Sequence, residues 1–278
     1  MGGKVEFRIL GPLEVWAGGV RLRLRGPRQA KALAVLLLGA GRVVTFAELI
    51  EAVWDDPPAT ARRQIQDLVP SLRRALTDHC GRDVISTERT GYILRLETDE
   101  LDAHRFEALV ASAGGTPEPA AAAQLYRSAL ALCRGPTLAG IDSHALEPAV
   151  ARWEERRLTV WEECLAAELA AGRRDGMVAD LRSLVAQSPL RERAVELLML
   201  ALWRDDRCSA LEAYQQYRHR LAEETGLDPS TKLIDLYQAV LRDDRRRSIL
   251  SPNPIGPSQP IGPGRPAQLP PDVPAFAG

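Results

Sequence analysis

The chain has 278 residues, of which 45% are hydrophobic, so it is long enough for two domains and apolar enough to build their cores. Residues 1–97 carry 15 Lys and Arg against 11 Asp and Glu, whereas residues 98–248 carry 20 against 25, so a basic part precedes an acidic part. The cysteines and histidines are too scattered for a metal site or a catalytic triad, and no phosphate-binding loop occurs, so neither enzymatic activity nor a cofactor is expected.

Three short segments rich in β-forming residues open the chain. They cover Val5–Leu10, Leu13–Trp16 and Val20–Leu24, and Gly-Pro and Gly-Gly turns separate them. Pro27 then suits the first position of a helix, and Ala30–Leu38 continues it as a strongly apolar run. The sequence therefore predicts three strands followed by a helix.

A second helix is predicted over Phe46–Trp54 from its start signal. Thr45 is a good N-cap, and Glu48, three residues later, completes a capping box. The polar, proline-containing segment Asp55–Pro58 interrupts the chain before the next helix.

The third helix, predicted from Thr60 to Leu76, has two contrasting faces. The apolar stripe that must pack on a core consists of Ile65, Leu68, Val69, Leu72 and Leu76. The opposite face and its flank carry Arg63, Gln66, Asp67, Arg73 and Arg74. Arginines and amides can make bidentate contacts to bases in a major groove, although an ordinary amphipathic surface helix has the same pattern.

The next segment, Val84–Leu96, favours a β-hairpin, because two β-rich runs flank a polar turn that contains Gly91. A hairpin directly after a basic helix is typical of the wing of a winged helix-turn-helix. Arg89 lies near the predicted tip, where it can reach phosphates or a minor groove. Tyr92 is expected to pack under the hairpin.

The second half of the chain, about Leu101–Leu241, reads as helices joined by short breaks at Arg173–Asp175 and Asp205–Arg207. Gly226, followed by a proline, is expected to close one long helix. Apolar positions recur at an offset of 33 residues, close to the period of tetratricopeptide-like helix pairs. The two matching sets are Leu165, Leu169, Val178, Leu181 and Leu184, and Leu198, Leu202, Leu211, Tyr214 and Tyr217.

The order of these elements resembles a known family. An N-terminal antiparallel sheet ahead of a winged helix-turn-helix resembles the OmpR-type DNA-binding domain. The segments Leu190–Arg204 and Ala210–Ser230 resemble the bacterial transcriptional activation domain. In this order the two units resemble the Streptomyces antibiotic regulatory protein family over roughly residues 5–242.

The resemblance implies a mainly α chain with a small α/β N-terminal domain. We expect an OmpR-type winged helix DNA-binding domain in residues 1–97 and an all-α domain of tetratricopeptide-like helical repeats, the activation domain, in residues 98–248. Residues 249–278 are rich in Pro and Gly and predict a disordered tail or linker. Some family members stop after the activation domain, whereas longer ones continue through a linker into an ATPase module.

The resemblance also assigns contacts to DNA. Pro70 stands where members commonly carry a small polar residue, and a proline in mid-helix removes a hydrogen bond and bends the helix. The C-terminal half of the helix is therefore expected to leave the groove early. Bases are expected to be read by Arg63, Gln66 and Asp67, with Asp67 accepting from cytosine or orienting Arg63. Phosphate or groove contacts are expected from Arg28, Thr60, Arg73, Arg74, Thr87, Arg89 and Thr90.

The function implied is sequence-specific activation of a secondary-metabolite (antibiotic) biosynthetic gene cluster. Protomers would bind double-stranded DNA side by side on direct repeats near promoters and recruit RNA polymerase with its sigma factor. The small positive charge of the first part favours a homo-oligomer on DNA, because one protomer offers few phosphate contacts. The helix with Trp153 and Trp161 is either a contact surface or internal packing.

Three alternatives remain. The chain is the N-terminal part of a larger regulator with an ATPase module, a tetratricopeptide-like protein-interaction adaptor, or a sensor whose helical domain binds a small molecule or peptide. No signal peptide and no apolar run of membrane-spanning length occurs, so a cytoplasmic protein without membrane contact is expected, associated with the nucleoid when bound to DNA.

Overall fold

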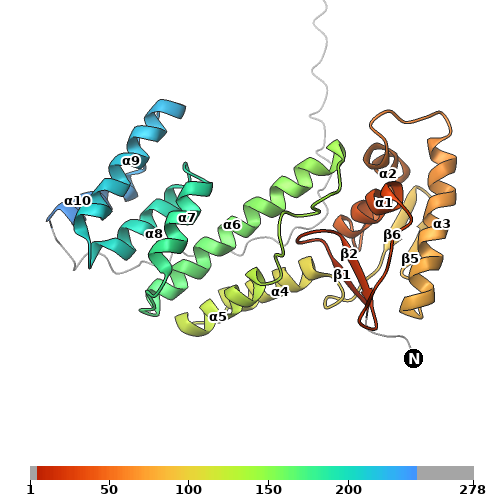
Figure 1. Cartoon of the computed structure of the whole chain (residues 1–278), viewed down its shortest axis with the longest axis horizontal. Helices are drawn as coiled ribbons and strands as arrows, with labels where there is room; N and C mark the ends of the chain where they lie inside the picture. Colours follow the sequence, from red (N-terminus) through yellow and green to blue (C-terminus); the bar gives the residue numbers. More distant parts are fainter. Residues whose placement is uncertain (1–4, 243–278) are drawn as a thin grey trace, which may run out of the picture.

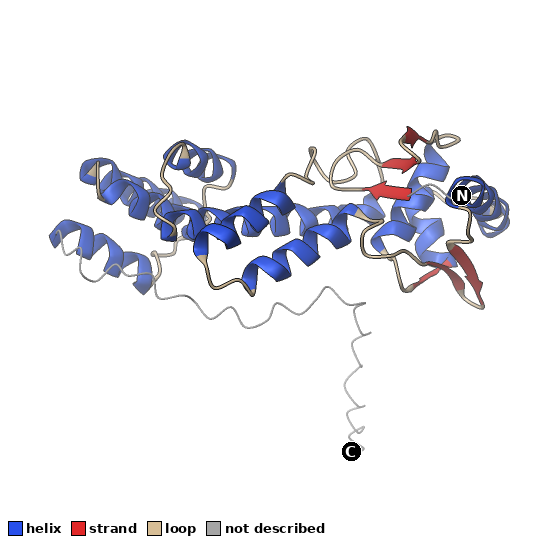
Figure 2. Cartoon of the chain, turned by 90° about the horizontal axis from the view of Figure 1, so that it is seen from below, coloured by secondary structure: helices blue, strands red, loops and turns tan. Residues whose placement is uncertain are grey.

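The computed structural model describes residues 5–242 and shows an elongated molecule (Figure 1). All strands lie at one end, and helices form the rest (Figure 2). The long helix α6 (Glu147–Ala170) runs from that end towards α9 (Arg207–Thr225) and α10 (Thr231–Arg242) at the other (Figure 1). The fold is mainly α with a small α/β part at the N-terminal end, as the sequence predicts.

The chain begins with an antiparallel sheet of order β1-β2-β3, formed by β1 (Val5–Arg8), β2 (Glu14–Ala17) and β3 (Val20–Arg21). Alternate side chains such as Phe7 and Val15 are buried, because successive residues of a strand point to opposite faces. All three predicted strands form, although their bounds differ from the predicted ones by up to three residues.

Three helices follow, namely α1 (Pro27–Leu38), α2 (Phe46–Val53) and α3 (Ala61–Cys80). Pro27 occupies the first turn of α1, where its missing N–H costs nothing. The capping box of α2 is confirmed: the Glu48 N–H donates to Thr45 Oγ1 over 3.2 Å, and the Thr45 N–H donates to the Glu48 carboxylate over 2.8 Å.

Replacing Thr45 with alanine is expected to lower the free energy of unfolding by about 1 kcal/mol, because the Glu48 N–H loses its acceptor. Burial raises the pKa of Glu48, but hydrogen bonds from Thr45 and Arg42 lower it more, so the pKa lies below the ordinary 4.5. Glu48 therefore contributes stability above pH 4.5 that is lost as the pH falls through its lowered pKa.

Urea unfolding of the wild-type and Thr45→Ala proteins across this pH range measures both effects. The difference between them is expected to shrink at acid pH, and Thr45→Ser is the control that keeps the acceptor. A Thr45→Ala variant as stable as Thr45→Ser would contradict the role of the cap.

The predicted hairpin forms from β5 (Ile85–Glu88) and β6 (Gly91–Leu94). A short strand that the sequence analysis missed, β4 (Val43–Thr45), pairs with β6 in a sheet of order β4-β6-β5. At Gly91 the two strands approach so closely that an added Cβ would lie 1.9 Å from the carbonyl oxygen of Val44. The glycine is therefore needed for this strand pair.

The rest of the described chain is helical, as predicted, with Gly226 ending α9 in the left-handed region (φ +72°). The remaining elements are α4 (Asp102–Gly114), α5 (Pro119–Leu130), the 3₁₀ turn η1 (His144–Leu146), α7 (Met177–Gln187) and α8 (Glu192–Trp203). The breaks expected near residues 173–175 and 205–207 fall between α6 and α7 and at the start of α9.

Two hydrophobic cores divide the molecule. The first extends from Val5 to Cys164, so the strands and α1–α3 share one interior with α4, α5 and the first part of α6. The second contains α7–α10 and the last part of α6. Trp153 packs on the first core, edge-on to Phe106, and Trp161 packs on the second, so both tryptophans contribute to packing.

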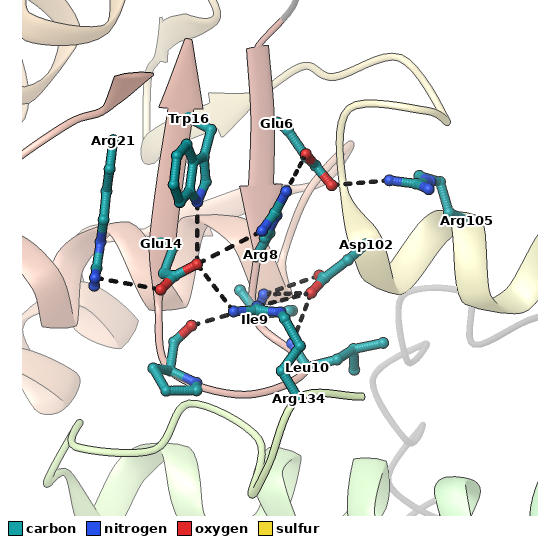
Figure 3. Close-up of polar contacts among 11 residues, drawn as sticks. Glu6, Arg8, Ile9, Leu10, Glu14, Trp16, Arg21, Asp102, Arg105 and Arg134 are labelled. Carbon is teal, nitrogen blue, oxygen red and sulfur yellow. Dashed lines mark hydrogen bonds and ion pairs between the residues drawn. The ribbon is translucent and has the colours of Figure 1, made fainter. Parts of the chain in front are cut away.

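A buried carboxylate joins the first sheet to α4 (Figure 3). Asp102, 1% exposed, accepts hydrogen bonds from the backbone N–H groups of Ile9 (2.8 and 3.0 Å) and Leu10 (3.0 Å). Arg134 lies 3.4 Å from Asp102 and donates to Glu14 on β2 over 3.0 Å. Burial raises the pKa of Asp102, and these hydrogen bonds and the charge of Arg134 oppose that shift.

The loop between α5 and η1 also forms hydrogen bonds with the segment that follows β1. Its backbone N–H groups at Arg134 and Leu138 donate to the carbonyl groups of residues 10 and 9 over 2.7 and 2.9 Å. The buried Ser143 hydroxyl donates to the carbonyl of Ala52 on α2 over 2.8 Å. The helical part of the chain therefore contacts both the first sheet and the helix-turn-helix.

Within residues 5–242, no helix combines the length and the apolar character needed to cross a membrane. The described part of the chain also contains no group of three or more His, Cys, Asp or Glu side chains that could hold a metal ion. The predicted disordered segment, residues 249–278, lies outside the described residues.

Candidate nucleic-acid interface

The helix α3 buries one face and exposes the other. Its buried face consists of Ala61, Ile65, Val69, Leu72 and Leu76, each at most 4% exposed, with Leu68 half-buried beside them. This confirms the predicted apolar stripe. Because the stripe is fixed on the first core, the opposite face of α3 must point away from the protein.

The exposed face of α3 forms a stripe of its own, in which Arg63, Gln66, Asp67, Pro70 and Arg74 recur at helical spacing. Among the described residues, none of the four polar side chains has a hydrogen-bond or ion-pair partner, so Asp67 does not hold Arg63. Free arginine and amide donors on one exposed helix face are what recognition of base edges requires.

The proline within α3 lies on this exposed stripe. The helix continues without a break through Pro70 to Cys80. Since proline has no N–H, the carbonyl of Gln66 loses its usual helical donor. Pro70 therefore removes one hydrogen bond from α3 without ending the helix.

The N-terminal ends of α1 and α3 are linked by side chains. Arg28 donates to Gln64 over 3.3 Å, and Gln64 donates to the Thr60 hydroxyl over 3.0 Å. The guanidinium of Arg28 also lies over the ring of Trp54, 5.4 Å from its centroid. Two predicted phosphate contacts, Arg28 and Thr60, are thus brought together through Gln64.

The start of α3 is also held against α2. Arg62 lies over the ring of Phe46 at 4.4 Å, and Tyr92 of the hairpin meets the same ring edge-on at 5.4 Å. Tyr92 is 4% exposed, which confirms that it packs under the hairpin. The sequence analysis missed Arg62 and Gln64, because only the folded arrangement shows which neighbours they meet.

The wing is the hairpin of β5 and β6, whose strands are joined by a two-residue turn. Arg89 and Thr90 form its exposed tip, and Glu88 pairs with Gly91 across the hairpin. Thr87, also exposed, accepts a hydrogen bond from Arg73 of α3 over 2.7 Å. Two residues that the sequence analysis assigned to phosphates, Arg73 and Thr87, therefore contact each other.

Positive side chains dominate the surface formed by α3, its N-terminal neighbours and the wing. The cations are Arg28, Arg62, Arg63, Arg73, Arg74 and Arg89, and the acids are Asp67, Asp78, Asp83 and Glu88. This excess of arginine favours the binding of a polyanion such as DNA.

Two family models match the chain. Residues 101–241 match the bacterial transcriptional activator domain, and residues 21–94 match the C-terminal domain of transcriptional regulatory proteins. The second match contains α3, the wing and every predicted DNA-contacting residue.

The chain is similar to named regulators in sequence and structure. It is 36% identical to the transcriptional regulatory protein MoaR1 of Mycobacterium tuberculosis, over 86% of this chain and 80% of the relative. It is 37% identical to the regulatory protein AfsR of Streptomyces griseus over 99% of its own length, but it spans only 28% of that relative. Among solved structures, Mycobacterium tuberculosis EmbR in complex with a low-affinity phosphopeptide is similar, with a TM-score of 0.83 and 30% identity over 87% of this chain and 66% of that one.

Proposed function

Because the chain belongs to the Streptomyces antibiotic regulatory protein family, we propose that it is a sequence-specific DNA-binding activator of a secondary-metabolite gene cluster. The observation that carries this proposal is the exposed stripe of α3, whose polar side chains have no partners among the described residues and lie beside an arginine-tipped wing.

In this proposal α3 enters the major groove. Arg63 donates to guanine, Gln66 bonds to adenine, and Asp67 accepts from a cytosine amino group. Phosphate or minor-groove contacts come from the surrounding exposed residues Arg28, Thr60, Arg74, Thr87, Arg89 and Thr90. The N-terminal position of Arg63 and Gln66 on α3 supports their role, because recognition helices present their first turns to base edges.

We assign residues 1–97 to DNA binding and residues 98–248 to activation, through RNA polymerase and its sigma factor. The opposite net charges of these parts support the division. Protomers bind direct repeats as a homo-oligomer. Since the chain spans 28% of its AfsR relatives, an ATPase module that follows in a longer protein is compatible with this assignment.

Replacing Arg63 with alanine is expected to remove sequence preference while leaving weak general binding. The loss of one bidentate base contact corresponds to about 1–3 kcal/mol, which is roughly a 5- to 150-fold loss in affinity for the preferred fragment. Fluorescence titration of tiled promoter fragments at two salt concentrations measures it.

The matched control is Arg220→Ala, because Arg220 is exposed on α9 at the other end of the molecule. Its affinity and fragment preference should equal those of the wild type. Weak binding to every fragment by all three proteins would reject the activator and favour a protein-interaction adaptor, to be tested by pull-down with the whole chain.

A further inference from the structure

The guanidinium of Arg73 lies between α3 and the wing. Its Nη2 donates to Thr87 Oγ1 over 2.7 Å, and its Nε lies 3.6 Å from the Asp83 carboxylate. Arg74, the next residue, is exposed and its side chain has no partner among the described residues. The two adjacent arginines therefore occupy different environments, one facing the protein and the other facing solvent.

Burial limits what Arg73 can offer to DNA. Its Nε is buried without a hydrogen bond, and the side chain as a whole is 27% exposed. With Nη2 engaged by Thr87, two of its three nitrogens face the protein. A bidentate phosphate contact needs two free donors on one edge of the guanidinium, so the edge formed by Nε and Nη2 does not fit one.

The turn after α3 places the acid that faces Arg73. Gly81, in the left-handed region at φ +67°, ends the helix and reverses the chain. Thr77 then donates to Asp83 over 3.4 Å, which holds the carboxylate on the same side as Arg73. The helix end, the turn and the wing thus meet at one arginine.

The residue opposite Thr87 in the hairpin is buried. Thr87 pairs across the hairpin with Tyr92, which packs on Phe46. Burial raises the pKa of Tyr92, and the nearby charge of Arg73 opposes that shift. Arg73 therefore contacts strand β5 rather than the Arg89–Thr90 tip, so a change in its position would move the strands of the wing.

We propose that Arg73 is a positioning residue that fixes the wing against the recognition helix and aims the Thr87 hydroxyl at a DNA phosphate. Because Thr87 Oγ1 accepts from Arg73, its own proton remains free to donate, and a phosphate oxygen can only accept. The DNA part of this inference rests on the proposed function, whereas the fixing of the wing does not.

Hydrogen exchange of the β5 and β6 amides in the whole chain, without DNA, tests the fixing of the wing. Arg73→Gln and Thr87→Val should each raise the exchange rate of the wing amides on the order of tenfold. The double variant should raise it no further, because both substitutions remove the same hydrogen bond. Thr87→Ser should restore slow exchange. Arg74→Gln is the matched control and should exchange like the wild type, and circular dichroism checks that all variants fold.

Titration with the preferred promoter fragment tests the effect on DNA. Arg73→Gln and Thr87→Val should each weaken binding roughly tenfold, again without adding in the double variant. Arg74→Gln should instead lower the slope of log affinity against log salt by about 0.9, as loss of a phosphate contact does.

The inference would be overturned if the wing amides of Arg73→Gln exchanged as slowly as in the wild type and the effects of Arg73→Gln and Thr87→Val on DNA affinity multiplied in the double variant. Arg73 would then be an ordinary phosphate contact. If wing exchange responds as expected but the wild type prefers no fragment, the proposed function fails and the fixing of the wing is supported.

Discussion

Replacing Asp102 with alanine is expected to lower the free energy of unfolding by about 3–5 kcal/mol, because two buried backbone N–H groups and Arg134 lose their common acceptor. The N–H groups of Ile9 and Leu10 would be left buried without an acceptor. Arg134 would lose the carboxylate that lies 3.4 Å away. Denaturant unfolding followed by tryptophan fluorescence measures the loss.

Two further variants isolate the cause. Asp102→Asn keeps one acceptor oxygen and should be less damaging than alanine. Asp142→Ala removes an exposed acid from the loop before η1 and should change stability by no more than about 0.5 kcal/mol. Equal stabilities of the Asp102→Ala and Asp142→Ala variants would show that the junction carboxylate does not stabilise the fold.

Replacing Gly91 with alanine is expected to lower the free energy of unfolding by about 3 kcal/mol and to loosen the wing. The new Cβ would lie 1.9 Å from the Val44 oxygen and 2.8 Å from the Thr45 Cα, both backbone atoms that no rotamer change can move. The β4–β6 pair must therefore separate, and DNA affinity should fall with it.

Gly114→Ala is the matched control for this change. Gly114 ends α4 with nothing within 4 Å of an added Cβ, so alanine there should be neutral or slightly stabilising. Thermal unfolding of both variants, followed by titration with the same DNA fragment, makes the comparison. If the Gly91→Ala and Gly114→Ala proteins had the same melting temperature, the close approach of β4 and β6 would be contradicted.

Local signals in the sequence predicted local structure well. The capping box at Thr45 and Glu48 involves residues three apart, and the apolar stripe of α3 repeats at helical spacing, so both are visible in a short window. The exposed stripe with Arg63 follows from the buried one, because the two faces of a helix are complementary. The hairpin was also predicted correctly, because its two β-rich runs and the turn between them lie within one short segment.

Contacts between distant segments could not be predicted in this way. The three residues of β4 form a strand only because β6, more than forty residues later, pairs with them. Asp102 stands at the start of α4, and nothing in the neighbouring sequence indicates that it bonds to residues 9 and 10. Periodicity shows which face is buried but not which neighbour covers it, so the interior shared across residues 97 and 98 was also missed.

The 24 residues of α6 connect the two cores as one continuous helix about 36 Å long, close to one turn of B-DNA. Its length therefore sets an angle as well as a distance. Each residue inserted in α6 would turn the α7–α10 core by about 100° around the helix axis and move it outward by about 1.5 Å. An insertion of about seven or eleven residues would nearly restore the original angle, within about 20°, so α6 is a phased spacer in which length changes preserve orientation only near a whole number of helical turns.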